Sequence, residues 1–404
     1  MSFARIVLCV IIYEYLLKGY WFMKDTSNKV LSVILIAIII ILLIILIKGI
    51  FTPAGESITD FLPFKSKGEE ETIYNSINEI AAKINGEIEK GTEGEISLMV
   101  STNVSSEELK DVYYMIDSMV GTIKSITTYE NGEENYRKVV FDYEKADSMY
   151  VYESIVENKE IPADKSRAKQ MESICKSFLN ENIKPGMSDY EKELCIHDYI
   201  VENTVYGFSL SHDDSEFNAY GALVNGRAVC SGYAAAMNLL LRCAGVESKI
   251  VIGDATDIYS KDSKTEKHAW NQVKVDGIWY NMDATWDDPV GAGEDRITHQ
   301  YFNVKDDILD DTHTWKTENA EKCDSMKANY YLYNNSYISD ASSLELYITN
   351  AYNINGKGNI ECALNNLDIN DDNLQFIFQL SGVESVKYSV TGSSEYSILS
   401  VYIN

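Results

Sequence analysis

Cys230 is the residue whose sequence context most favours covalent chemistry. It follows a glycine-containing turn and opens a strongly helical run that Gly245 closes, so we expect it at the start of a helix. There, unpaired backbone N–H groups and the positive end of the helix dipole favour the thiolate, the reactive form of cysteine. This context predicts a nucleophile. If Cys230 acted alone, a buried structural cysteine would be the better interpretation.

His268 and Asp283 are predicted to supply a base and the group that orients it. The Asp276-Gly277 dipeptide is typical of a two-residue β-hairpin turn, and His268 and Asp283 lie on either side of it. Asp283 would accept a hydrogen bond from one imidazole nitrogen, and the other nitrogen would face Cys230. Together the three residues would form a catalytic triad.

The register of this hairpin decides whether the two side chains meet. With Val275 opposite Ile278, Trp270 falls opposite Asp283, and His268 is a diagonal neighbour of Asp283 on the same face. A loop one residue longer or shorter would separate them. The other face is apolar enough to be the core side, which would leave the polar face free for chemistry. That apolar face carries Ala269, Val273, Val275, Ile278, Tyr280 and Met282.

The segments GRAVCSGYA and KHAWNQVKVDGIWYNMDATWDDP resemble the core of the transglutaminase-like superfamily, which has a papain-like fold. The resemblance covers residues 163–315 at most. It implies the roles of nucleophile, base and orienting carboxylate for Cys230, His268 and Asp283. It also suggests Trp270 and Trp286 as walls of the substrate cleft. Tyr220, where the motif region begins, is a further expected substrate contact.

The resemblance implies an enzyme that acts on peptide or side-chain amides through a thioester, but it does not fix the acceptor. Attack by water would make a peptidase or amidase, and attack by a lysine amine would make a transglutaminase. Because no sequence feature predicts the exclusion of water, hydrolysis at the cell envelope is the expected reaction. Amine transfer and a non-catalytic binding module are the alternatives.

Residues 30–47 are eighteen consecutive residues without a charge, nearly the length needed to cross a bilayer. We interpret them as an uncleaved signal anchor that leaves the catalytic part outside a single-pass membrane protein. A second span at 6–17 would reverse this topology, but it is short and contains Glu14. Translation starting at Met23 rather than Met1 is a further alternative.

The predicted fold class is α+β. A cytoplasmic N-terminus (1–29), transmembrane anchor (30–48) and linker (49–68) precede a small α+β domain (69–160), the catalytic domain (161–325) and a β-rich C-terminal domain (326–404). Helical patterns cover 73–84 and 163–205, with helix starts at Ser105 and Ser188, where Glu191 completes a capping pattern. Strand patterns cover 95–100 and 137–143. Alternating apolar residues at 344–348 and 375–379 suggest further strands.

Composition excludes some functions. A net charge of −27 opposes binding to nucleic acid, so we expect a protein or peptide substrate, and the membrane only as an anchoring partner. The seven cysteines show no C-x-x-C spacing, so neither a zinc site nor a disulfide framework is expected. We predict no metal and no cofactor. The acidic residues after the hairpin, such as Asp287 and Asp306, are expected to be solvated surface, and His197 an ordinary packed or surface residue.

Overall fold

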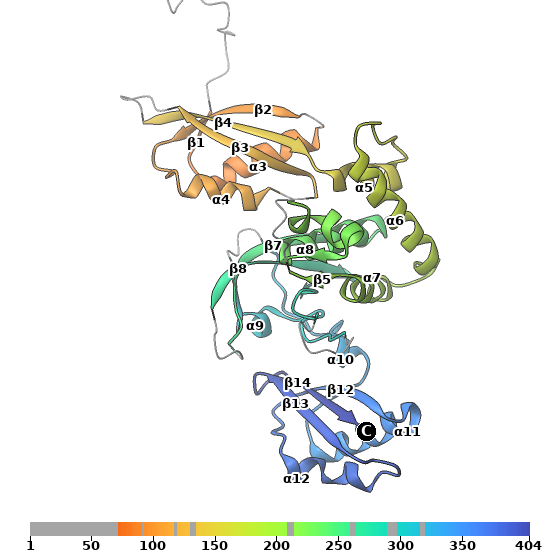
Figure 1. Ribbon diagram of the computed structural model, residues 1–404. Helices are drawn as coiled ribbons and strands as arrows, with labels where there is room; N and C mark the ends of the chain where they lie inside the picture. Colours follow the sequence, from red (N-terminus) through yellow and green to blue (C-terminus); the bar gives the residue numbers. More distant parts are fainter. Residues whose placement is uncertain are drawn as a thin grey trace, which may run out of the picture. The chain divides into compact units, whose positions relative to one another are not determined.

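Figure 1 shows the computed structural model, which describes residues 72–90, 93–116, 119–129, 135–207, 214–258, 264–288, 297–315 and 320–404. The predicted N-terminus, membrane anchor and linker at 1–29, 30–48 and 49–68 lie outside these residues. Within the described ranges, no helix combines the length and apolar character needed to cross a bilayer. Membrane attachment and the predicted domain boundaries therefore stay predictions from the sequence.

The first sheet has four strands in the order β1-β2-β4-β3. Its elements are β1 (Ile73–Tyr74), α3 (Ile77–Glu89), β2 (Gly94–Ser101), α4 (Glu108–Met115), β3 (Gly121–Tyr129) and β4 (Tyr136–Lys145). Both predicted strands are confirmed. The helix expected from Ile73 begins at Ile77, because Ser76 accepts a hydrogen bond from the Glu79 N–H and caps it. Ser105 acts at the start of α4, where its hydroxyl accepts from the Glu108 N–H at 3.1 Å.

The elements around Cys230 combine helices with a second, antiparallel sheet of order β10-β7-β8-β9. The helices are α5 (Asp147–Glu157), α6 (Ser166–Asn182), α7 (Asp189–Asn203), α8 (Cys230–Cys243) and α9 (Asp306–Leu309). The sheet strands are β7 (Ser248–Thr256), β8 (Thr265–Val275), β9 (Ile278–Met282) and β10 (His313–Trp315), and β5 (Val205–Tyr206) pairs with β6 (Arg227–Ala228). The predicted capping box of Ser188 and Glu191 opens α7.

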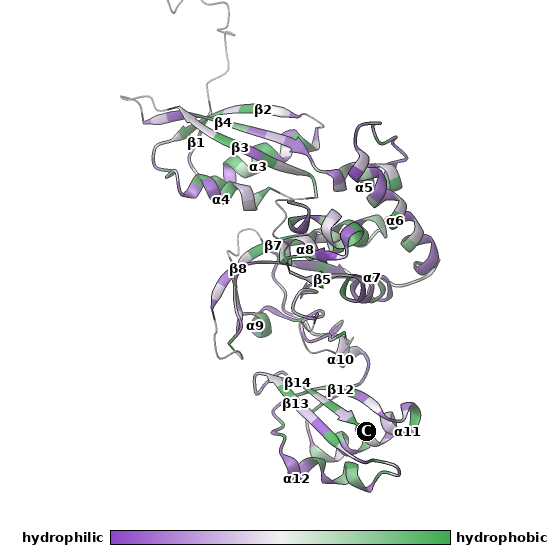
Figure 2. Ribbon diagram, viewed as in Figure 1, coloured by the Kyte–Doolittle hydropathy of each residue, from purple (hydrophilic) through white to green (hydrophobic). Residues whose placement is uncertain are grey.

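Helix α8 is central to this part of the structure because residues 232–241 are all buried. Most of their apolar side chains pack in one hydrophobic cluster with residues of α6, α7, β8 and β9. Figure 2 shows hydrophobic residues along α8, whereas hydrophilic residues colour much of α6. The burial of α8 fixes the position of its first residue, Cys230.

The β8–β9 hairpin has the predicted register. Val275 pairs with Ile278, and Asn271 pairs with Met282. Asp276 and Gly277 have φ angles of 50° and 80°, the left-handed conformations that a two-residue type I′ turn requires.

One prediction about this hairpin is wrong, because its polar face is not free. Gln272 and Asn281 on that face are completely buried, as is Trp270 at 1% exposure. The Gln272 amide donates to Asn281 Oδ1 at 3.0 Å and to the Glu321 carbonyl at 2.8 Å, and Asn281 donates to Asp306 Oδ1 at 2.8 Å. The sheet can bury these polar groups because each finds a partner.

The C-terminal sheet has the order β11-β12-β14-β13. Its strands are β11 (Tyr337–Ile338), β12 (Gly358–Leu364), β13 (Val386–Gly392) and β14 (Ser397–Ile403), with helices α10 (Tyr330–Tyr333), α11 (Ala341–Asn355) and α12 (Asp371–Leu374). The strand expected at 344–348 is wrong. These residues lie in α11, which Asp340 caps and which buries Leu344, Ile348 and Tyr352 at helical spacing. The strand expected at 375–379 is also wrong, because this segment is the 3₁₀ helix η5 (Gln375–Gln379). This region is therefore mixed α and β rather than β-rich.

Candidate active site

Cys230 is the first residue of α8, as predicted, and its side chain is partly exposed. Two glycines allow the backbone around it to pack closely. A Cβ atom at Gly232 would lie 2.5 Å from the Glu216 carbonyl oxygen, and one at Gly221 would lie 2.4 Å from that of Ser215. The 3₁₀ turn η2 (Asp214–Phe217) is thereby held against the start of α8.

The other cysteines contrast with Cys230. All six cysteines in the described part of the chain are free thiols. Burial raises the pKa of Cys243, the last residue of α8, to about 12, and burial also raises the pKa of Cys362 to about 12.

His268 lies in β8 and links Cys230 to Asp283. Its Nε2 is 2.7 Å from Asp283 Oδ2, and because a carboxylate only accepts, Nε2 donates. Nδ1 is left for the Cys230 thiol, with which His268 also interacts. Burial alone would lower the pKa of His268, but Asp283 and then Cys230 outweigh burial and raise it to about 10. The contacts of His268 with Asp283 and with Cys230 thus both favour its protonated form.

Asp283 directly follows β9 and is buried, with hydrogen bonds on both oxygens. Its Oδ1 accepts from the backbone N–H groups of Thr285 at 3.0 Å and Trp286 at 3.3 Å. Its Oδ2 accepts from His268 and from a second imidazole, His313 Nε2, at 3.1 Å. Burial alone would raise the pKa of Asp283, but the His268 charge and both imidazole hydrogen bonds hold it below its usual range. The carboxylate therefore stays ionised.

His313 is a site residue that sequence reasoning missed. It belongs to β10 and reaches Asp283 because β10 pairs with β7, where His313 is opposite Ala255. Its side chain is fully buried, and burial lowers its pKa. No local sequence motif surrounds His313, so only its residue type could have indicated a role. It reaches the site through the pairing of two strands that are distant in the sequence.

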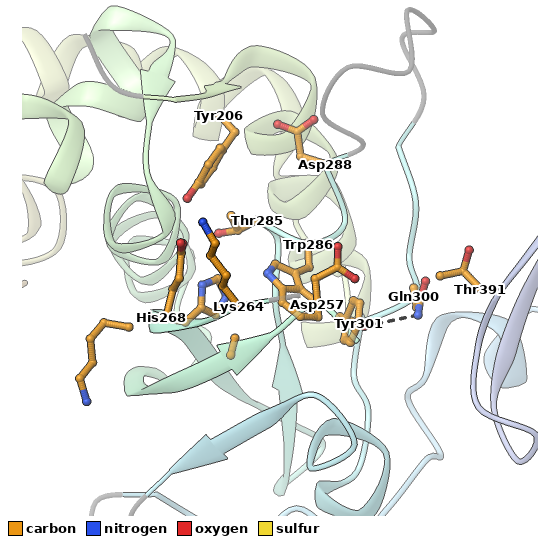
Figure 3. Close-up of a pocket in the computed structure, with 13 residues that line it drawn as sticks. Tyr206, Asp257, Lys264, His268, Thr285, Trp286, Asp288, Gln300, Tyr301 and Thr391 are labelled. Carbon is orange, nitrogen blue, oxygen red and sulfur yellow. Dashed lines mark hydrogen bonds between the residues drawn. The ribbon is translucent and has the colours of Figure 1, made fainter. Parts of the chain in front are cut away.

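A pocket of about 490 Å³ opens beside His268. Figure 3 shows its side chains, which come from β5, β7, β8, the residues that directly follow β7 or precede β8, the segments after β9, and β13. It is lined by Tyr206, Ala255, Asp257, Lys264, Glu266, Lys267, His268, Thr285, Trp286, Asp288, Gln300, Tyr301 and Thr391. The lining carries charges of both signs.

The predicted substrate contacts separate into one that lines this pocket and two that do not. Trp286 is a lining residue. Trp270 is buried beneath His313 and Trp315, with ring centroids 5.1 Å and 5.6 Å away, so it cannot form a cleft wall. The Tyr220 hydroxyl donates to Gln170 Oε1 at 2.6 Å, and Tyr220 is not a lining residue. The positions of Trp270 and Tyr220 in the sequence motif gave no information on whether their side chains would face the pocket.

A second histidine–carboxylate cluster lies between α7 and the segments after β9. His197 is 3.2 Å from Asp287 Oδ2 through Nε2 and 3.0 Å from Asp198 Oδ1 through Nδ1. His299 Nε2 is 2.9 Å from the same Asp198 oxygen. Burial alone would lower the pKa of His197, but the two carboxylates raise it to about 9. His197 is thus a packed residue, as predicted.

The expectation that Asp287 is solvated surface is wrong. Asp287 is completely buried and accepts hydrogen bonds from His197 and from the Tyr301 N–H at 2.9 Å. Asp306 likewise accepts from Asn281 and from the Cys323 N–H at 3.0 Å. These carboxylates hold the polypeptide after the hairpin in place.

Both clusters contain the donor types of a metal site. The ligand atoms of His197, Asp198 and His299 lie within 4.8 Å of one another, as do those of His268, Asp283 and His313. Their nitrogen–oxygen distances, from 2.7 to 3.1 Å, are those of hydrogen bonds between histidine and carboxylate. Hydrogen bonding accounts for each of these contacts.

Comparison with known proteins agrees with the geometry. The family model for the transglutaminase-like superfamily matches residues 176–284, which include Cys230, His268 and Asp283. This segment belongs to the transglutaminase-like superfamily. The transglutaminase-like segment thus runs from α6 to just beyond β9 and contains both the buried helix and the hairpin.

Two curated relatives match part of this chain. Kyphoscoliosis peptidase of Homo sapiens is 26% identical over 148 residues, which are 34% of this chain and 21% of that protein. Its counterpart in Mus musculus is 30% identical over 126 residues, which are 28% of this chain and 18% of that protein. The matches span about a fifth of the length of these relatives. Among solved structures, calcium-bound LapG of Legionella pneumophila is 14% identical, with a TM-score of 0.24 over 46% of this chain and 98% of that one.

Proposed function

We propose that this protein is a cysteine-nucleophile enzyme that hydrolyses peptide or side-chain amides, with Cys230, His268 and Asp283 as its triad. The observation that carries the proposal is the 2.7 Å hydrogen bond between His268 and Asp283 beside a cysteine at a helix N-terminus. If His268 and Asp283 only stabilised the hairpin, there would be no need for a thiol beside the imidazole nitrogen that does not contact Asp283.

The first half of the reaction forms a thioester. The Cys230 thiolate attacks the amide carbonyl carbon, and the C–N bond breaks as His268 gives its proton to the leaving amine. Asp283 keeps the imidazole in one orientation throughout, because two backbone N–H groups fix the carboxylate. Backbone N–H groups at the start of α8 are positioned to stabilise the carbonyl oxygen as it becomes negative.

The second half consumes water. The neutral imidazole of His268 takes a proton from water, the resulting hydroxide adds to the thioester, and the C–S bond breaks to release a carboxylic acid and the Cys230 thiolate. Hydrolysis is favoured over amine transfer because the pocket is lined by charged side chains, including Asp257, Lys264 and Glu266, which hold water.

The proposal places the enzyme at the cell membrane. Its support is the run of eighteen uncharged residues at 30–47, which would anchor the chain once and leave the catalytic part outside. Proteins or peptides of the cell envelope would then be the substrates. Protease added to intact cells should cleave residues after Lys48, and complete protection would contradict this topology.

The test uses the full chain in detergent micelles with an unfolded protein substrate and a fluorescent primary amine. Mass spectrometry scores new peptide or carboxylate ends against amine incorporation. Hydrolysis that disappears in Cys230→Ala, and persists in Cys243→Ala as the matched control, supports the proposal. Amine incorporation as the dominant product would make the protein a transferase. Absence of both reactions, with Cys230 no more reactive than Cys243, would indicate a binding module.

A further inference from the structure

We propose that His313 is a positioning residue of the active site, which shares the Asp283 carboxylate with His268 and thereby limits how tightly that carboxylate holds the His268 proton. The inference rests on the proposed function, because it assigns His313 a part in the same reaction. His313 itself does not line the pocket beside His268.

The contacts of His313 define its protonation. Its Nε2 is 3.1 Å from Asp283 Oδ2, the same oxygen that accepts from His268 Nε2 at 2.7 Å. Because the carboxylate only accepts, His313 Nε2 carries a proton. His313 Nδ1 is 2.8 Å from the Thr312 hydroxyl, which also lies 3.3 Å from the Leu309 carbonyl oxygen, and burial lowers the pKa of His313 and so favours its neutral form. Asp283 Oδ2 thus accepts hydrogen bonds from two imidazole N–H groups.

The geometry gives this second donor an electrostatic role rather than an orienting one. Asp283 Oδ1 is already held by the N–H groups of Thr285 and Trp286, which fix the carboxylate plane. The His313 N–H instead withdraws charge from the oxygen that His268 uses. Without His313, the full negative charge of Asp283 would act on His268. The His268 imidazolium would then be a weaker acid toward the leaving amine.

Other titratable groups also face this site. The Cys230 thiol comes from α8, the Tyr206 phenol from β5, and the Tyr301 ring lies 5.8 Å from the His313 ring. Charged side chains that line the pocket are Asp257, Lys264, Glu266, Lys267 and Asp288. None of them changes in the variants below, so a difference between variants reports on position 313.

His313 also packs against rings, and this structural role must be separated from the hydrogen bond. Its ring centroid is 4.6 Å from that of Trp286 and 5.1 Å from that of Trp270. His313→Phe keeps an aromatic ring and removes the donor. His313→Gln keeps an N–H donor at the reach of Nε2 and removes the ring. His313→Phe therefore tests the loss of the hydrogen bond, and His313→Gln tests the loss of the ring.

The experiment measures the rate at which iodoacetamide alkylates Cys230 in the full chain from pH 5 to 11, by mass spectrometry. The upper inflection of this profile reports loss of the His268 proton. We expect His313→Phe to move it upward by about half a pH unit or more, and His313→Gln to leave it within about 0.2 units of the unmodified protein. With a cleavable peptide, kcat should fall about tenfold in His313→Phe with KM unchanged.

Each result has a distinct meaning. If His313→Phe leaves the inflection unchanged, or if His313→Gln moves it equally, the hydrogen bond has no electrostatic role and the inference is wrong, while the proposed function stands. If Cys230 of the unmodified protein is no more reactive than Cys243, the proposed function fails, and the inference with it. Thermal unfolding verifies that each variant is folded, and His313→Leu replaces His313→Phe if the latter does not fold.

Discussion

Two buried clusters in this protein have nearly the same composition, and only one of them is placed to do chemistry. His268, Asp283 and His313 form the first, while His197, Asp287, Asp198 and His299 form the second. In each, carboxylates raise the pKa of a buried histidine, to about 10 for His268 and about 9 for His197. A histidine–carboxylate pair with a raised pKa is therefore not by itself an active site.

The difference lies in the second nitrogen of each imidazole. Both nitrogens of His197 face carboxylates, Asp198 and Asp287, so both donate and neither can accept a proton from a reacting group. His268 uses Nε2 for Asp283 and keeps Nδ1 for Cys230. The first cluster also borders the pocket, whereas none of the four residues of the second lines it. The second cluster therefore has a structural role, whereas the first contains a base, His268, that Asp283 orients.

The largest expected effect comes from removing the nucleophile that lies beside the first cluster. Cys230→Ala should abolish amide hydrolysis, because it removes the thiol that forms the thioester. The melting temperature should change little, since the substitution removes one sulfur atom from a partly exposed position. Product release is measured by mass spectrometry and folding by thermal unfolding. Turnover by this variant at the normal rate would rule out the triad.

The next effect removes the orienting charge. Asp283→Asn should lower kcat by between about tenfold and a thousandfold. The amide can still accept from Thr285 and Trp286 through Oδ1, but its NH₂ group then faces His268, which favours the tautomer with the proton on Nδ1. Unlike the sequence alone, the structure also predicts a loss of stability, because His313 loses its acceptor.

Rate and melting temperature are both measured for Asp283→Asn. Asn281 is the nearest residue that could orient His268 instead, and it is unchanged in this variant. The Asn281 side chain already bonds Gln272 and Asp306. An unchanged rate and pH profile in Asp283→Asn would show that the carboxylate is structural.

The sequence was sufficient to predict the parts of this site that depend on local patterns. The Asp276-Gly277 turn determines the hairpin register, and with it the meeting of His268 and Asp283, because side chains alternate between faces of a strand. The glycine-rich turn before Cys230 and the apolar run after it were sufficient to predict a helix start.

The parts that escaped prediction depend on contacts between distant segments. His313 reaches Asp283 only through the pairing of β10 with β7, which no local pattern indicates. The polar face of β8 appeared free because its partners, such as the Glu321 backbone, come from a later segment. Leu344 and Ile348 fit both strand alternation and helical spacing, and the Asp340 cap decides for the helix.

A smaller effect separates the two tryptophans that the motif suggested together. Trp286→Phe should raise KM by about threefold to tenfold with a smaller change in kcat, because Trp286 lines the pocket while its backbone N–H still bonds Asp283. Trp270→Phe should lower the melting temperature and leave KM unchanged, because Trp270 is buried. Steady-state kinetics of both variants with one peptide is the measurement. Equal KM values for the two variants would contradict this assignment.

The smallest effect on rate is expected in the second cluster. His197→Gln should change kcat less than about twofold but lower the free energy of unfolding by about 2–4 kcal/mol, because it leaves buried Asp287 without its charged partner. A histidine whose pKa is raised on folding contributes stability that is complete below its unfolded value of about 6.5 and is lost as pH rises through about 9.

Thermal unfolding from pH 6 to 10 checks this prediction. The stability gap between the unmodified protein and His197→Gln should narrow with increasing pH. A gap that stays constant would show that the His197 charge does not contribute, and a large loss of kcat in a folded variant would give the second cluster a catalytic role.

The central claim is that Cys230 is an activated nucleophile, and helix α8 carries its own control at the opposite end. Cys230 and Cys243 are the first and last residues of α8, both partly exposed, and burial raises the pKa of Cys243 to about 12. Iodoacetamide applied to the full chain at pH 6.5 should alkylate Cys230 at least about a hundred times faster than Cys243, and His268→Ala should remove most of that advantage. Equal alkylation of the two cysteines, or an advantage that survives the loss of His268, would contradict the triad.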